Sequence, residues 1–237
     1  KVPIEKCLEP LEDGKFIHQG WSPRCETFPA RTLEKWGVLK TTAIQDGFFL
    51  EDENKELPSH LSPKEKLEIS AGDILLTCVG PRARCGIACT VPSIRPRLLM
   101  SGKMYRFRAD RSQILTEYLG LFLRTSMSWA AIDAMKTGSS ESGLNLTKDR
   151  FRNFEVQFGS LDEQRKILAK VNELMALLVR LEAARMAREA TRDRLTAASL
   201  AHLGAPNPDP ATFKDHAAFA LDALPALTAL SDHERLA

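Results

Sequence analysis

The most constraining feature of this chain of 237 residues is a helical pattern over residues 160–203. Ser160 and Glu163 have the spacing of a capping box, in which each side chain bonds the backbone N–H of the other residue. Good helix formers fill the rest of the range, and Gly204 follows it as a stop signal. At about 1.5 Å per residue, the predicted helix is roughly 60 Å long.

Apolar side chains recur along the first half of this predicted helix at alternating spacings of four and three residues, the pattern of a coiled-coil seam. The seam consists of Ile167, Val171, Leu174, Leu178 and Leu181. The sequence before it contains no second helix with such a seam. We therefore expect a partner helix, which another copy, another protein or a longer polypeptide would supply.

The chain before residue 110 contains short apolar runs between Gly, Pro, Asp and Asn, which is typical of strands. Predicted strands cover residues 37–44, 73–79, 86–91, 98–109 and 154–158. In residues 98–109 a core-facing set alternates with an opposite set, as in a half-buried strand. The core-facing set is Tyr105, Phe107 and Ala109, and the opposite set is Met104, Arg106 and Arg108.

Two further regions are expected to be helical. A mostly apolar helix capped by Thr116 is expected to run towards Met135 and to pack on the sheet. In the C-terminal tail, the pattern predicts two short amphipathic helices interrupted at Pro225. The fold class is therefore predicted to be α+β, a mixed β-rich domain followed by a long coiled-coil-forming helix.

The net charge of +2 conceals a local asymmetry. No acidic residue lies between Asp73 and Asp110, whereas that interval contains several cations. They are Arg82, Arg84, Arg95, Arg97, Lys103, Arg106 and Arg108. If they share one face they will attract a polyanion such as DNA, and the alternative is an ordinary solvated face.

The five cysteines, the absence of an N-terminal signal pattern and the lack of a long apolar run predict a cytoplasmic protein with no membrane span. Cys78, Cys85 and Cys89 lack the CxxC spacing of a zinc site, so structural thiols are expected and no metal. The phosphate-binding patterns GxGxxG and GxxxxGK[ST] are absent, and the five histidines are scattered. We therefore expect a recognition module and no catalytic residues.

A series of segments then resembles the target-recognition domains of the specificity (S) subunit of type I restriction-modification systems. In chain order they are FIHQGWSPRCE, WGVLKTTAIQDGFF, ISAGDILLTCVGPRARCGIACTV, SGKMYRFRAD, TGSSESGLNLTKDRF and SLDEQRKILAKVNELMALLVRLE. The most distinctive elements are GD-I-L-L-x-x-x-G and L-x-EQ-x-x-I. The resemblance covers about residues 1–203.

The resemblance implies a non-catalytic DNA-specificity subunit. Such subunits carry two recognition domains, each reading half of a split double-stranded DNA site, joined by two long antiparallel helices. Adenine methyltransferase subunits and restriction/translocase subunits bind to them, and S-adenosylmethionine, ATP and Mg are expected on those partners and not on this chain. This sequence has one recognition domain and one such helix, so it is either half of a longer subunit or a half-subunit that homodimerises.

The predicted organisation is a DNA target-recognition domain (residues 1–159), a spacer helix (160–203), and a linker with short amphipathic helices (204–237). Polar or basic loop residues are expected to contact DNA. They are Gln19, Trp21, Ser22, Arg24, Lys40, Thr41, Thr42, Arg82, Arg84, Lys103, Lys136, Ser139 and Ser140.

Arg82 and Arg84 lead this set, because VGPRARCG is expected to form a projecting hairpin tip from which arginine can clamp guanine or phosphate. Several alternatives remain open. The tip could instead be a solvated turn, and Trp21 could be a core residue. Residues 40–42 could form a strand edge, and the Gly-Ser loop that contains Ser139 and Ser140 could be a linker. The alternative function is a coiled-coil interaction scaffold without DNA specificity.

Overall fold

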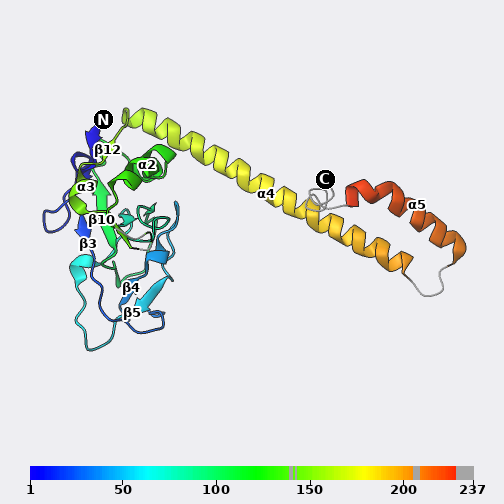
Figure 1. The fold of residues 1–237 in the computed structure, drawn as a ribbon, viewed down its shortest axis with the longest axis horizontal. Helices are drawn as coiled ribbons and strands as arrows, with labels where there is room; N and C mark the ends of the chain where they lie inside the picture. Colours follow the sequence, from blue (N-terminus) through cyan, green and yellow to red (C-terminus); the bar gives the residue numbers. More distant parts are fainter. Residues whose placement is uncertain (139–140, 142, 205–208, 228–237) are drawn as a thin grey trace. The chain divides into compact units, whose positions relative to one another are not determined.

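The computed structural model describes residues 1–138, 141, 143–204 and 209–227. The chain forms two compact units, residues 1–168 and 169–237. The first unit contains the β-rich domain and the first turns of the long helix, and Figure 1 shows the elements of both units.

The first unit contains twelve short strands among its described residues. They are β1 (Val2–Pro3), β2 (Leu8–Glu9), β3 (His18–Gln19), β4 (Gly37–Leu39), β5 (Asn54–Glu56), β6 (Ile74–Thr77), β7 (Val79–Gly80), β8 (Ala88–Thr90), β9 (Leu98–Leu99), β10 (Met104–Ala109), β11 (Leu144–Asn145) and β12 (Glu155–Val156). The α-helices are α1 (Thr116–Leu123), α2 (Ser126–Met135), α3 (Lys148–Arg152), α4 (Leu161–Leu203) and α5 (Pro210–Leu227). Three 3₁₀ turns are η1 (Ile4–Cys7), η2 (Thr41–Ala43) and η3 (Glu65–Leu67).

Strand β10 is the centre of the main sheet. It pairs antiparallel with β2, β3 and β6, and β6 pairs in turn with β8. A second sheet has the order β5-β4-β9, in which β4 and β9 are parallel. Two small pairs, β1 with β12 and β7 with β11, join distant parts of the chain.

Both faces of β10 are covered, so the prediction of a half-buried strand was wrong. Tyr105, Phe107 and Ala109 lie in one hydrophobic core, as expected from their alternation. The opposite face is also buried, because Met104 belongs to a second core that contains residues of β4 and β9. Arg106 is 1% exposed and is held there by polar partners.

The buried arginine of β10 belongs to an ion-pair network. Arg106 donates to Glu12 over 3.0 Å and lies 3.6 Å from Asp73. Arg108 donates from its Nε to the same Asp73 over 2.6 Å. Asp73 is fully buried, and its other oxygen accepts from the backbone N–H of Ser70. Burial of these charges is tolerable because each has partners.

Three further element boundaries differ from the sequence prediction. Residues 98–109 form two strands, because the chain turns at Gly102–Lys103 between β9 and β10. Residues 37–44 give β4 and the 3₁₀ turn η2. The helix predicted from Thr116 breaks into α1 and α2, and the hydroxyl of Thr125 caps α2 by accepting from the Ser128 N–H over 3.2 Å.

Helix α4 begins where the sequence predicted. Ser160 and Glu163 form the capping box, in which the Ser160 N–H donates to Glu163 over 2.7 Å and the Glu163 N–H to the Ser160 hydroxyl over 3.4 Å. The helix continues for 43 residues to Leu203 and is followed by Gly204. The seam predicted on it is largely exposed within this single chain, with Leu178 51% and Leu181 66% exposed.

Gln164 fastens the start of α4 to the domain. Its side chain is fully buried, and its amide donates to the carbonyl oxygens of Gln113 and Gly159, each over 3.0 Å. Its carbonyl oxygen accepts from the N–H of Leu115 over 2.8 Å, immediately before α1. The side chain therefore satisfies three backbone groups that would otherwise lack partners.

In the second unit, α5 continues through Pro225, where the sequence predicted an interruption, and the rest of the second predicted helix lies outside the described residues. Asp209 caps α5 by accepting from the Thr212 N–H over 3.0 Å. Pro225 lies near the end of the described part of α5, where its missing N–H removes a single backbone bond. The rings of His202 in α4 and His216 in α5 stack with centroids 4.2 Å apart.

Within the described part of the chain, no helix is both long enough and apolar enough to cross a membrane.

Candidate nucleic-acid interface

The segment Gln19 to Ser22 lies against the turn that enters β10. The Gln19 side-chain amide donates to the Gly102 carbonyl over 2.8 Å, and the Ser22 hydroxyl accepts from the Gly102 N–H over 3.1 Å. Gly20 is required here, because a Cβ at that position would lie 2.2 Å from the Ser101 carbonyl oxygen. The approach places Gln19 and Ser22 beside the exposed Lys103.

We call Gln19, Ser22, Gly102 and Lys103 the β3–β10 corner. Within the described part of the chain, Lys103 has no hydrogen bond or ion pair from its side chain. Gln19 retains its side-chain carbonyl oxygen for an external partner, whereas its amide donates to the Gly102 carbonyl over 2.8 Å and to the Cys78 sulfur over 3.9 Å. The corner is therefore open to a polyanion.

Trp21 and Arg24 leave this segment in different directions. Trp21 is half-buried and packs against the second hydrophobic core, with the Lys64 ammonium 4.6 Å from its ring centroid. This placement agrees with the core interpretation of Trp21. Arg24 is exposed and, among the described residues, has no side-chain partner.

Arg84 does not stand at a projecting tip, as the sequence had suggested. Its guanidinium lies on η2 and donates to the carbonyls of Thr41 and Ile44, each over 2.7 Å. A third bond reaches the side chain of Gln45 over 3.3 Å. The Thr41 carbonyl also accepts from the Ile44 N–H over 3.2 Å, and Arg84 adds a second donor there and joins two loops.

Residues 40–42 are themselves engaged around Glu53. The Lys40 ammonium lies 2.7 Å from the Glu53 carboxylate, to which the Thr42 hydroxyl also donates. These two contacts, led by the one from Lys40, lower the pKa of Glu53. The charge of Lys40 is thus balanced within the protein, and Thr41 faces Arg84 through its backbone.

Arg82 is exposed but neutralised. Its guanidinium donates to Glu141 over 2.8 Å and to Asp133 over 2.6 Å. The bond from Glu141 is the main reason why the pKa of Arg82 is raised. A phosphate would have to compete with these two carboxylates for this side chain.

Lys136 is buried, contrary to its prediction as a DNA contact. Its side chain is 1% exposed, and its ammonium donates to Asp133 over 2.8 Å and to the Arg82 carbonyl over 3.0 Å. The ammonium also lies 4.3 Å from the ring centroid of Trp129. Lys136 therefore holds the Arg82 loop onto α2. Ser139 and Ser140 lie outside the described residues.

Most of the cations between Asp73 and Asp110 are engaged within the protein, so they do not supply the free basic face that was one of the two alternatives left open by the sequence. Arg95 donates to the Ala30 carbonyl over 2.7 Å and Arg97 to the Glu34 carbonyl over 2.7 Å. With Arg106 and Arg108 in the buried network, most of these cations organise loops and strands. Lys103 alone among the seven, in the described structure, lacks such a partner.

No group of three or more His, Cys, Asp or Glu among the described residues is placed to hold a metal ion. Cys78, Cys85 and Cys89 are buried free thiols. Burial raises the pKa of Cys78 and of Cys89 to about 12 in each case, which keeps both thiols protonated and unreactive at neutral pH.

Comparison with known proteins decides the family. The family model described as "Type I restriction modification DNA specificity domain" matches residues 34–188, well over half of the chain. The chain belongs to this family. The resemblance inferred from GD-I-L-L-x-x-x-G and L-x-EQ-x-x-I is thereby confirmed.

Individual relatives agree with this assignment. The chain is 34% identical over 185 residues to the type I restriction enzyme EcoEI specificity subunit of Escherichia coli, a match that covers 76% of this chain and 31% of that protein. This chain therefore corresponds to less than a third of that specificity subunit.

Solved structures share the fold. The HsdS subunit from Thermoanaerobacter tengcongensis matches with a TM-score of 0.54 at 21% identity, over 78% of this chain and 49% of that one. A chain from a type I R-M system, reported for its complex assembly and conformational transition, matches with a TM-score of 0.59 at 20% identity, over 87% and 50%. The S subunit from M. genitalium matches with a TM-score of 0.51 at 13% identity, over 94% and 49%. The predicted α+β class with a long helix after a β-rich domain is confirmed.

Proposed function

We propose that this chain is a non-catalytic DNA sequence-specificity component of a type I restriction-modification complex and reads one half of a bipartite site. The observation that carries the proposal is the β3–β10 corner in a chain of the DNA specificity domain family. At this corner Gln19, at the end of β3, and Ser22 contact the turn that carries Lys103, and no carboxylate neutralises Lys103 in the described structure.

In this proposal, different residues at and near the corner bind the DNA backbone and read the bases. Lys103 and Arg24 bind phosphates, which sets the register of the protein on the duplex, and Gln19 reads a base edge. Arg82 and Arg84 contribute chiefly by fixing the loops around η2 and α2, since their bonds are made within the protein. The sequence had instead placed Arg82 and Arg84 first among the expected DNA contacts.

The exposed seam of α4 is the proposed binding surface for a second long helix. That helix belongs either to the rest of a longer subunit or to a second copy of this chain. Adenine methyltransferase and restriction subunits are the further proposed partners, and they supply S-adenosylmethionine, ATP and Mg. The fact that this chain spans about half of the matched structures supports a missing second half.

The test is a genome-wide map of N6-methyladenine in a strain with the intact gene and in one lacking its recognition segment. Loss of methylation at one split motif is the expected result, and it identifies the bases read. A matched pair of variants, Lys103→Gln and Lys55→Gln, then separates the corner from general charge, since Lys55 is exposed on β5.

DNA binding by Lys103→Gln should have a salt slope lower by about 0.9 than the wild type, the value of one phosphate contact, and Lys55→Gln should not. Unchanged methylation, in a strain that expresses the methyltransferase, would favour the interaction scaffold instead.

A further inference from the structure

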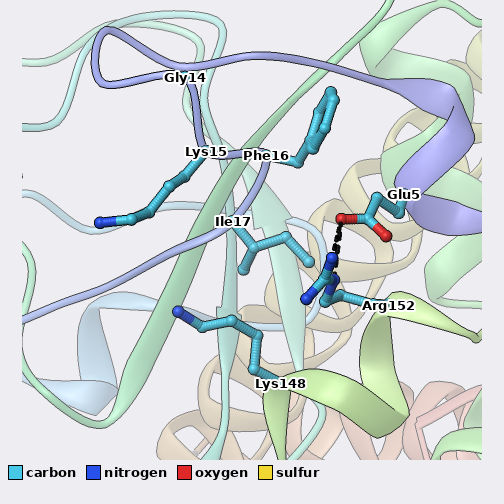
Figure 2. A pocket seen from close by; sticks show the side chains of 7 residues that line it. All are labelled: Glu5, Gly14, Lys15, Phe16, Ile17, Lys148 and Arg152. Carbon is cyan, nitrogen blue, oxygen red and sulfur yellow. Dashed lines mark hydrogen bonds and ion pairs between the residues drawn. The ribbon is translucent and has the colours of Figure 1, made fainter.

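The first unit contains a hollow of about 430 Å³. Figure 2 shows the side chains around it, and we call it the lysine pocket. It is lined by Glu5, Gly14, Lys15, Phe16, Ile17, Lys148 and Arg152. Three of these residues are cationic and one is anionic, so the lining carries excess positive charge.

The three cations of the lysine pocket are not equally neutralised. Arg152 is fully engaged with Glu5, through bonds of 2.8 and 2.7 Å. Lys15 lies 3.2 Å from Asp13, but that carboxylate also accepts a 2.7 Å bond from His18. Lys148, within the described part of the chain, has no hydrogen bond or ion pair from its side chain.

The lysine pocket has two charged ammonium groups and a separate apolar wall. In Figure 2 the ammonium ends of Lys15 and Lys148 point to the same side, away from the Glu5–Arg152 pair. Ile17 and Phe16 supply an apolar wall. Two like charges that share one hollow repel each other, so an anion bound between them is favoured.

Two backbone segments connect the lysine pocket with the β3–β10 corner. Ile17 immediately precedes β3, which contains Gln19. On the other side, the Leu146 N–H donates to the Cys78 carbonyl over 2.8 Å, and the Gln19 amide lies 3.9 Å from the Cys78 sulfur. Lys148 follows Leu146 by two residues, so pocket and corner flank the same pair of backbone segments.

We propose that the lysine pocket binds a phosphate group of the DNA backbone, with Lys15 and Lys148 as its ligands. This inference rests on the proposed function and adds a second anchoring point to it. The volume exceeds what a phosphate requires and leaves room for the attached sugar against Ile17 and Phe16. The Glu5–Arg152 pair joins η1 to α3 and keeps the walls of the pocket in place.

The experiment compares the full chain with the double variant Lys15→Gln/Lys148→Gln on duplex DNA over a series of salt concentrations. Removal of one phosphate contact is expected to lower the slope of log affinity against log salt by about 0.9. The control Lys55→Gln/Lys214→Gln removes the same charge from exposed positions elsewhere and should keep the slope. The charge-retaining Lys15→Arg/Lys148→Arg should also keep it, which separates loss of charge from loss of folding.

A second arm distinguishes a DNA phosphate from free phosphate. Inorganic phosphate is titrated into wild type and double variant, and binding is followed by phosphorus NMR. If phosphate binds to the wild type only, while both proteins have the same DNA salt slope, the pocket is a free-phosphate site and the proposal is overturned. An equal slope without phosphate binding also overturns it. If the wild type itself shows no salt-dependent DNA binding, the proposed function fails as well.

Discussion

Gln164→Glu is the substitution that most directly tests how the long helix is attached to the domain. The change preserves the shape of a side chain that is fully buried. It replaces the amide donor, which serves the carbonyls of Gln113 and Gly159, by an oxygen that cannot donate when ionised. The acceptor for the Leu115 N–H remains.

The expected cost follows from those two lost bonds. Each leaves a buried carbonyl without its donor, at about 1–3 kcal/mol per group. Gln164→Glu should therefore reduce the free energy of unfolding by about 2–6 kcal/mol at neutral pH. The loss should shrink as the pH falls towards about 4, because a protonated carboxyl regains one donor.

Urea unfolding of the full chain measures this cost, and Gln157→Glu is the matched control. Gln157 is exposed and its side chain makes no hydrogen bond in the described structure, so its substitution should cost less than about 0.5 kcal/mol. Hydrogen exchange gives a local measurement, since the Leu115 amide should lose protection in Gln164→Met, which removes its acceptor. Equal stabilities of Gln164→Glu and Gln157→Glu would refute the reasoning.

Three further results are expected. Phe151→Ala should destabilise the domain by about 3–5 kcal/mol in urea unfolding, because the ring packs on Tyr105, Phe107 and Phe154, whereas Phe48→Ala at an exposed site should have little effect; similar costs would contradict this account. The pKa of Asp13 is held below its ordinary value of 3.8, chiefly by the bond from His18, so the carboxylate stabilises the fold above that pH and this contribution is lost as the pH falls further. Unfolding midpoints of wild type and Asp13→Asn should accordingly converge under acid, and a constant difference would exclude this linkage. Leu174→Glu/Leu178→Glu should abolish any association through α4 in sedimentation experiments, while Leu221→Glu on α5 should not; assembly unaffected by the seam variant would place the contact elsewhere.

The sequence predicted well where one local rule decides the outcome. The start of α4 depends on the capping box of Ser160 and Glu163, and its end on Gly204, so both boundaries followed from short-range spacing. The alternation along β10 was also correct for its core-facing residues. The burial of its other face depended on a second sheet, β5-β4-β9, two strands of which, β4 and β5, are distant in sequence from β10.

The residues predicted to contact DNA were harder to choose, because the sequence does not show which charged side chains will pair with one another in the folded protein. In the sequence, Lys136 and Arg84 have the charge expected of DNA contacts. In the folded chain, Lys136 donates to Asp133 and Arg84 donates to a carbonyl of η2. The lysine pocket was missed for the converse reason. Lys15 and Lys148 are more than a hundred residues apart and belong to no motif, so only the tertiary structure brings them to one hollow.

The motifs that mark the family have structural roles in this chain. In GD-I-L-L-x-x-x-G, Asp73 is buried and anchors Arg106 and Arg108, while Ile74 and Leu75 enter opposite hydrophobic cores. In L-x-EQ-x-x-I, Gln164 clamps the helix to the domain.

These side chains are fixed because buried polar groups demand exact partners. Exposed residues such as Gln19, Arg24 and Lys103 are not constrained in this way, since water can replace any partner they lose. If the β3–β10 corner reads DNA as proposed, substitutions at the corner can change the sequence that is read without disturbing the framework. Substitutions at Gln19 should therefore alter the bases read at little cost in stability, whereas substitutions at Asp73 should unfold the domain before any change in specificity can be measured.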